Sequence, residues 1–100
     1  MRISLASKDV IITDQLQTYA EYRLFTSIAR YQALIREVNV TLEHNRGNRG
    51  RFLCVVTVDL GAGEQIMIRA YGAHPNAAID RAADRTSLRL SHRSSHHVSS

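Results

Sequence analysis

The 100-residue sequence is poor in cysteine, proline, lysine and tryptophan, and it has no long apolar run. Its single cysteine, Cys54, excludes an intramolecular disulfide and a zinc site built on several thiolates, and it favours a reducing cytoplasm. The longest apolar stretches, such as residues 52–56, are far too short to cross a bilayer, so we expect no membrane association. No secretory signal pattern precedes the first apolar residues, so we expect no export.

Positive charge is in moderate excess and is carried almost entirely by arginine. Thirteen lysine and arginine residues against nine aspartate and glutamate residues leave a net charge of +4, and Lys8 is the only lysine. An excess of this sign is typical of a protein with a polyanionic partner. The planar arginine side chain donates two parallel hydrogen bonds to a phosphate, although arginine enrichment is also typical of GC-rich genomes.

The spacing of apolar residues predicts one α+β domain over residues 1–93, followed by a polar tail over residues 94–100 that frays. The predicted order is β-α-β-β-β-α, with strands at residues 1–6, 37–43, 52–60 and 66–70, a first helix from Thr13–Asp14 to Tyr31 or Gln32, and a second helix from Pro75 to Arg93. We expect a four-stranded antiparallel sheet with one exposed face. Both helices cover the other face, which makes a two-layer sandwich.

The same patterns predict which side chains face the core. Strand residues alternate between the two faces of a sheet, and helix residues three or four apart share one face. The predicted core residues are Val38, Val40, Leu42, Phe52, Cys54, Val56, Val58, Leu60, Ile66, Ile68 and Ala70 from the strands, and Leu16, Ala20, Leu24, Ile28, Tyr31, Ile79, Ala82, Ala83, Thr86 and Leu90 from the helices.

Two stretches of the sequence resemble one known family. Residues 1–16, Met-Arg-Ile-Ser-Leu-Ala-Ser-Lys-Asp-Val-Ile-Ile-Thr-Asp-Gln-Leu, resemble the start of the bacterial ribosome hibernation-promoting factors, also called sigma-54 modulation proteins. Residues 76–85, Asn-Ala-Ala-Ile-Asp-Arg-Ala-Ala-Asp-Arg, resemble that family's Ala-Ala-Ile-Asp segment at the start of the last helix. The resemblance covers most of residues 1–93. The sequence resembles the short type of this family, because the C-terminal domain of longer members has no counterpart in it.

This resemblance implies a fold similar to the double-stranded-RNA-binding domain and a function without catalysis or a cofactor. Family members bind the small ribosomal subunit in the channel used by messenger and transfer RNA, and they silence translation in starved or stationary cells. We therefore expect a cytoplasmic translation inhibitor that binds small-subunit ribosomal RNA and occludes this channel.

Basic residues of the second predicted helix gather on one side. At roughly 100° per residue, Arg81, Arg85, Arg89 and His92 lie within about a quarter turn. Arg93 and His96 extend the row if the helix continues, whereas Asp80, Asp84, Ser87 and Ser91 occupy a different side. Such a row is suited to contact with successive phosphates, although a solvated helix face has the same pattern.

The first helix carries a second pair of basic residues. Arg23 and Arg30 are seven residues apart and share a face, so the arginines of both helices are expected to border one basic groove. Tyr19 lies near this groove and is a candidate for stacking on an unpaired base. The alternative is that the arginine stems and Tyr19 merely cover the margin of the core.

Further candidate RNA contacts are Arg46, Arg49 and Arg51 in and beside a glycine-rich hairpin connection, and Lys8 after the first strand. In the double-stranded-RNA-binding fold, contacts across the minor groove include such connecting segments. Basic loops also serve solubility alone, so both interpretations stay open for this group.

The sequence gives little support for metal binding or catalysis. His92 and His96 have i, i+4 spacing but lack nearby acidic or thiol partners, so we expect no metal site. Cys54 falls on the inward face of a strand and is expected to act as a small apolar residue rather than a nucleophile. No phosphate-binding glycine loop or nucleophile elbow occurs, so we expect no enzyme.

Two other functions stay open. One is a general binder of structured RNA. The other is a protein-interaction module, favoured by Thr26, Leu88 and Ser91, which stand where the family is often basic. An apolar patch expected on the open sheet face could form a weak homodimer, or it could be scattered exposed side chains; its members are Leu53, Val55, Met67 and Tyr71.

Overall fold

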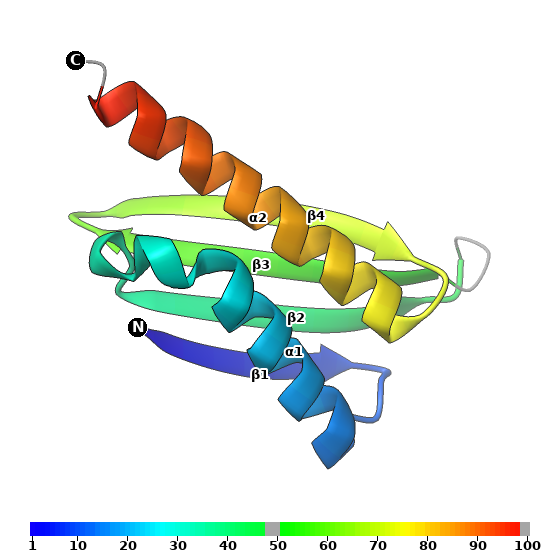
Figure 1. The fold of residues 1–100 in the computed structure, drawn as a ribbon. Coiled ribbons are helices and arrows are strands. Elements are labelled where there is room, and N and C mark those ends of the chain that lie inside the picture. The colour runs from blue at the N-terminus through cyan, green and yellow to red at the C-terminus, as the bar shows by residue number, and fades with distance from the viewer. Residues whose placement is uncertain (48–50, 99–100) are drawn as a thin grey trace.

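A computed structural model describes residues 1–47 and 51–98. It contains a four-stranded sheet with both helices on one face, which confirms the predicted α+β sandwich (Figure 1). The elements are β1 (Arg2–Lys8), α1 (Asp14–Ile28), a 3₁₀ helix η1 (Ala29–Leu34), β2 (Glu37–Asn45), β3 (Arg51–Gly61), β4 (Glu64–Gly72) and α2 (Pro75–Val98). None of the helices in the described part is long and apolar enough to span a bilayer.

The sheet is mixed rather than antiparallel. Its strand order is β1-β2-β3-β4, and β2–β3 and β3–β4 are antiparallel pairs as expected. The pair β1–β2 is parallel, which corrects the prediction. The reason is the connection, because α1 carries the chain back across the sheet before β2 begins, and a crossover of this kind joins parallel strands.

The ends of the helices follow local chemistry. The Thr13 hydroxyl accepts a hydrogen bond from the Leu16 amide at 3.1 Å, and Asp14 lies in the first turn of α1. The α-helix ends at Ile28, earlier than predicted, and the chain tightens into η1 before it enters β2. Helix α2 begins at Pro75 as predicted and continues to Val98, so it includes most of residues 94–100, which were predicted to form a frayed polar tail.

The core lies between the sheet and the helices and contains the predicted residues. The inward residues of β2, β3 and β4 from Val38 to Ala70 are buried, with Phe52 and Leu60 packed against them. Helix α2 contributes Ile79, Leu90 and the buried Thr86, whose hydroxyl donates to the Ala82 carbonyl at 2.7 Å. Burial raises the pKa of the Cys54 thiol to about 12, so this group stays protonated and apolar in character.

The open face of the sheet is less apolar than the sequence suggested. Leu53 is only 8% exposed, and its cross-strand partner Tyr71 is half-buried, as is Val55. Met67, at 55%, is the most exposed member of the predicted patch. The surface available for a homodimer on this face is therefore smaller than expected, and the dimer stays a prediction.

Candidate nucleic-acid interface

Two arginines of α2 lie over the free edge of the sheet. Arg81 donates a hydrogen bond to the backbone carbonyl of Tyr71 at 3.0 Å, and Arg85 donates one to that of Arg69 at 2.7 Å. Both acceptors belong to β4, the strand at one end of the sheet. Arg89 follows one turn further along α2 and is exposed. We call Arg81, Arg85 and Arg89 the α2 arginine flank.

These contacts orient the guanidinium groups without cancelling their charge. A carbonyl oxygen is neutral, and one bond uses one of the five N–H donors of an arginine. The remaining donors of Arg81 and Arg85 are therefore available to an anionic ligand. Both side chains are exposed, so such a ligand can reach them from solvent.

Arg93 lies in a different environment. Its guanidinium binds both carboxylate oxygens of Glu64, at the start of β4. A bidentate pair of this kind matches the charge of the arginine with that of an acid. Arg93 was predicted to extend the basic row, and the structure gives it an acidic partner instead.

The seam between α1 and α2 holds a network centred on Arg23. Its Nε lies 3.0 Å from Asp80 Oδ1, and one terminal nitrogen lies 3.1 Å from Asp84 Oδ1. Its other terminal nitrogen donates to the Ser27 hydroxyl at 2.9 Å. The hydrogen bond to Asp84 raises the pKa of Arg23 above its usual value. Arg23 is thus part of the packing between the helices.

Tyr19 belongs to the same network. Its hydroxyl donates to Asp80 Oδ1, and this bond, with burial, raises the pKa of the phenol above its usual value. The ring is half-buried against the core, as one of the two interpretations of this residue predicted.

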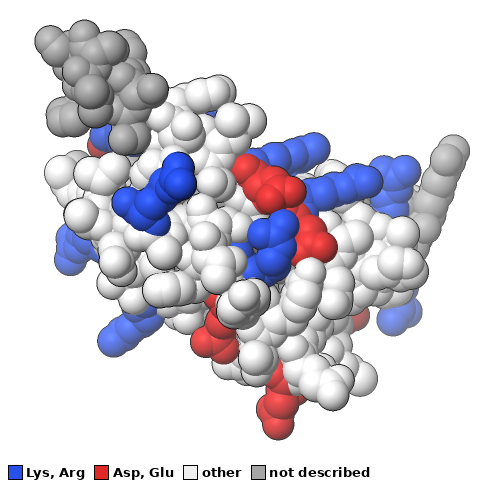
Figure 2. Space-filling model, in the orientation of Figure 1, with Lys and Arg blue, Asp and Glu red and all other residues white. Residues whose placement is uncertain are grey.

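The prediction that the arginines of both helices border one groove is wrong. Asp80 and Asp84 face α1 and bind Arg23, whereas Arg81 and Arg85 reach in the other direction, over β4. Helix α2 therefore separates the two sets. On the helical face of the molecule, acidic atoms lie directly beside basic atoms near the middle, while other basic atoms lie toward the margins (Figure 2).

The other predicted cations are dispersed. Arg30 is exposed, with its guanidinium carbon 6.0 Å from the centre of the Tyr31 ring. Arg46 and Arg51 are exposed beside the β2–β3 connection, and Arg49 lies outside the described residues. The structure brings Lys8 and Arg46 together at a hollow of about 310 Å³, which also contains acidic side chains. This mixture of charge weakens its attraction for phosphate.

His44, which lines the hollow beside Lys8, belongs to a stacked pair that was not predicted from the sequence. The rings of His44 and Phe52 are 4.4 Å apart and nearly parallel. They are cross-strand partners in β2 and β3, so only knowledge of the strand register could have predicted the pair. Among the described residues, no group of three or more histidine, cysteine, aspartate or glutamate side chains is placed to hold a metal ion.

Comparison with known proteins decides the family. The profile described as "Sigma 54 modulation protein / S30EA ribosomal protein" matches residues 3–97. The chain belongs to this family. The resemblance noted in the sequence is thereby confirmed, and the family is one of ribosome-associated proteins.

Two solved structures are similar to this S30EA family member. The N-terminal domain of Protein Y from Thermus thermophilus is 30% identical, with a TM-score of 0.75, and the match covers 90% of this chain and 96% of that one. A ribosomal subunit interface protein from Coxiella burnetii is 18% identical, with a TM-score of 0.79 and coverage of 95% and 99%, and it supports the fold alone. A comparison with curated protein sequences finds no match.

The network in this S30EA family member predicts a structural role for Arg23. Replacing Arg23 by glutamine should lower the free energy of unfolding by about 0.5–1 kcal/mol, since the ion pairs are partly exposed. Affinity for ribosomes should change by less than about threefold, because the charge of Arg23 is already matched. Thermal melting and co-sedimentation measure the two effects.

The matched control is Arg30→Gln, which removes an equal charge from an exposed position in η1, the 3₁₀ helix that follows α1. It should leave the melting temperature almost unchanged. A loss of binding in Arg23→Gln that exceeds the loss in Arg30→Gln, at unchanged stability, would contradict the structural role.

Proposed function

We propose that this protein binds the small ribosomal subunit through phosphates of its RNA and occludes the channel used by messenger and transfer RNA. In this proposal it silences translation in the cytoplasm of starved or stationary cells, as a hibernation factor. Membership of the S30EA family supports association with ribosomes. The observation that carries the RNA contact is the α2 arginine flank.

The flank is suited to phosphate for two reasons. Its three cations follow one another along a helix, and bonds to neutral carbonyls hold two of them in place. Contacts with phosphate position a protein on nucleic acid without reading its sequence. The helix beneath them is rigid, since Ile79, Ala82 and Leu90 are fully buried against the sheet.

The proposed mechanism requires only that the protein binds the subunit and fills the channel. A packed domain held across a channel excludes other ligands from it by steric hindrance, without a cofactor. Arg30, Lys8, Arg46, Arg49 and Arg51 are secondary candidates for RNA contact in this proposal. Arg23 and Arg93 contribute mainly to the fold, because carboxylates match their charge.

The salt dependence of binding tests the proposal. Three phosphate contacts predict that affinity for purified small subunits falls roughly 20- to 40-fold between about 50 and about 200 mM salt. Sedimentation of the labelled protein with subunits at several salt concentrations measures this slope. An affinity that does not depend on salt would contradict phosphate binding.

A second ligand separates the proposal from its nearest rival. A duplex RNA of about 16 base pairs spans the binding site of a double-stranded-RNA-binding domain. We expect intact small subunits to bind much more tightly than this duplex at equal salt. Equal affinity would indicate a general binder of structured RNA instead.

A further inference from the structure

Exposed apolar side chains are concentrated in the first third of the chain, which contains β1 and α1. Seven large hydrophobic residues in the described part of the chain are exposed, and five of them lie within the first 34 residues. Among these five, Tyr22 is 66% exposed and Phe25 is 43% exposed on α1. Arg23 faces α2; Phe25 lies about 160° from Arg23 around the helix and is turned away from α2, whereas Tyr22 lies about 100° from Arg23.

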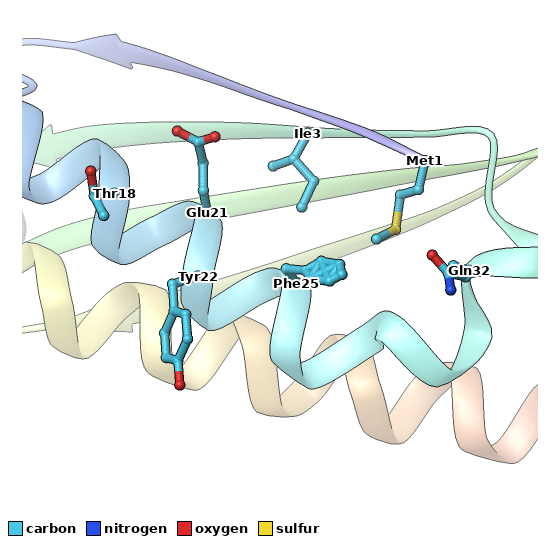
Figure 3. Close-up of a pocket in the computed structure, with 7 residues that line it drawn as sticks. All are labelled: Met1, Ile3, Thr18, Glu21, Tyr22, Phe25 and Gln32. Carbon is cyan, nitrogen blue, oxygen red and sulfur yellow. The ribbon is translucent and has the colours of Figure 1, made fainter.

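These side chains border a groove between α1 and β1. It has a volume of about 530 Å³, with Met1 and Ile3 on the β1 side and Glu21 and Phe25 on the α1 side. Met1, Ile3 and Phe25 point into the same space (Figure 3). A second hollow of about 470 Å³ continues along α1 and shares Thr18 and Tyr22 with the groove.

The groove lies beside an open strand edge. In the part of the chain that the structure describes, strand β1 ends the sheet and pairs only with β2, so its outer backbone groups face away from the sheet. At the opposite edge, Arg81 and Arg85 bind two carbonyls of β4. Within residues 1–47 and 51–98, no comparable side-chain bond covers the outer edge of β1. Such an edge can accept an added strand.

The charges at the groove select its ligand. The charged side chains that line the two hollows, within the described residues, are Glu21 and Asp14, and both are acidic. Met1 also lines an adjoining hollow, whose charged residues are Arg2, Arg36, Glu37 and Asp59. A protein of net charge +4 therefore has a locally acidic and apolar surface here. RNA phosphates are repelled from such a surface, whereas lysine and arginine side chains are attracted.

We propose that β1 and this groove bind an extended basic segment of another protein by strand addition. The backbone of the segment pairs with β1. On its helix-facing side, apolar side chains enter the groove beside Phe25, and a lysine or arginine meets Glu21. The side chains on its other face are neutral, because Arg2 and Lys8 occupy that face of β1.

A second copy of this chain fits the edge poorly. In a two-fold pairing of β1 with β1 centred on Leu5, Arg2 of one copy lies opposite Lys8 of the other. Like charges directly opposite one another destabilise a strand pair. This register disfavours a second copy, and the acidic side chains of the two hollows favour a basic segment of a different protein.

The test uses the isolated chain and needs no ribosome, so it is independent of the proposed function. The probe is the peptide acetyl-Thr-Val-Thr-Lys-Thr-Val-Thr-amide, which reads the same in both directions and places valine and lysine on one face. We expect saturable shifts of the Ile3, Leu5 and Phe25 amide resonances in the 15N-labelled protein. The same peptide with glutamate in place of lysine should bind at least about tenfold more weakly.

Variants of the protein locate the contact. Each of the variants Glu21→Gln and Phe25→Ala should lower the affinity for the lysine peptide at least about threefold. Gln65→Lys adds the same charge as Glu21→Gln at an exposed position on β4, and it should have no effect. The amide spectrum of each variant shows whether it is folded.

Backbone methylation tests strand addition itself. A strand added at an edge pairs through one of its sides, so methylation of one set of alternate peptide amides should abolish binding and methylation of the other set should not. Non-saturable shifts, equal binding of the glutamate peptide, or equal loss in both methylated forms would overturn the proposal. Shifts of the same amides by a single-stranded RNA would assign the groove to nucleic acid instead.

Discussion

The variant Arg85→Glu/Arg89→Glu is expected to lose at least about 100-fold in affinity for small ribosomal subunits, because two phosphate contacts become two repulsions. The fold should survive. Arg85 loses one exposed hydrogen bond to the Arg69 carbonyl, which costs about 1 kcal/mol or less. Co-sedimentation with subunits and thermal melting measure the two effects separately.

A matched control removes the same charge elsewhere. Arg2→Glu/Arg36→Glu changes the net charge by the same amount at two exposed positions near the other edge of the sheet. It should retain most of the binding. Equal losses in both variants would mean that net charge, rather than the α2 arginine flank, determines affinity.

The largest effect on stability is expected from Gly72→Ala. A Cβ atom at this position would lie 2.5 Å from the Ala78 nitrogen and 2.8 Å from the Ala77 carbonyl carbon. Both are backbone atoms at the start of α2, so the helix itself has to move away from β4. We expect a loss of about 3 kcal/mol in the free energy of unfolding. This corresponds to a melting temperature lower by roughly 12–24 °C.

Gly47→Ala is the control for this change. Its Cβ would meet only the Asn45 side-chain oxygen at 3.8 Å, which is an ordinary contact, so stability should change by less than about 0.5 kcal/mol. Differential scanning calorimetry of both variants compares them directly. If the Gly72→Ala protein has the same melting temperature as the parent protein, α2 does not pack closely against β4.

The order of elements and the core followed from the sequence because each depends on local periodicity. Val38, Val40 and Leu42 alternate with polar residues, and all three are buried as predicted. The direction of β1 did not follow, because strand direction depends on the path of α1 across the sheet. The end of α1 at Ile28 was also missed, since a 3₁₀ turn contains the same residue types as an α-helical turn.

The candidate site was predictable within one helix and not between elements. The spacing of Arg81, Arg85 and Arg89 placed them along one side of α2, apart from Asp80. The partner of Arg23 is 57 residues away, and that of Arg93 is 29 residues away. Side-chain pairs so distant in sequence arise only when the chain folds. For this reason the sequence pattern wrongly predicted that the arginines of the two helices border one groove.

The two edges of the sheet are used differently. At β4, arginines of α2 bind backbone carbonyls and block the addition of another strand. At β1 the edge is open beside an apolar groove with Glu21 on its wall. In our proposals, the β4 side of the molecule contacts RNA and the β1 side contacts protein.

The central claim is that α2, rather than the open face of the sheet, contacts ribosomal RNA. Directed hydroxyl-radical cleavage tests it, with an iron chelate attached to an introduced cysteine. Cys54 is buried with a raised pKa, so it does not compete for the label. Leu88→Cys, at an exposed site on α2, should cleave small-subunit RNA, and Met67→Cys, on the open face, should not. Cleavage from position 67 and none from position 88 would contradict the account.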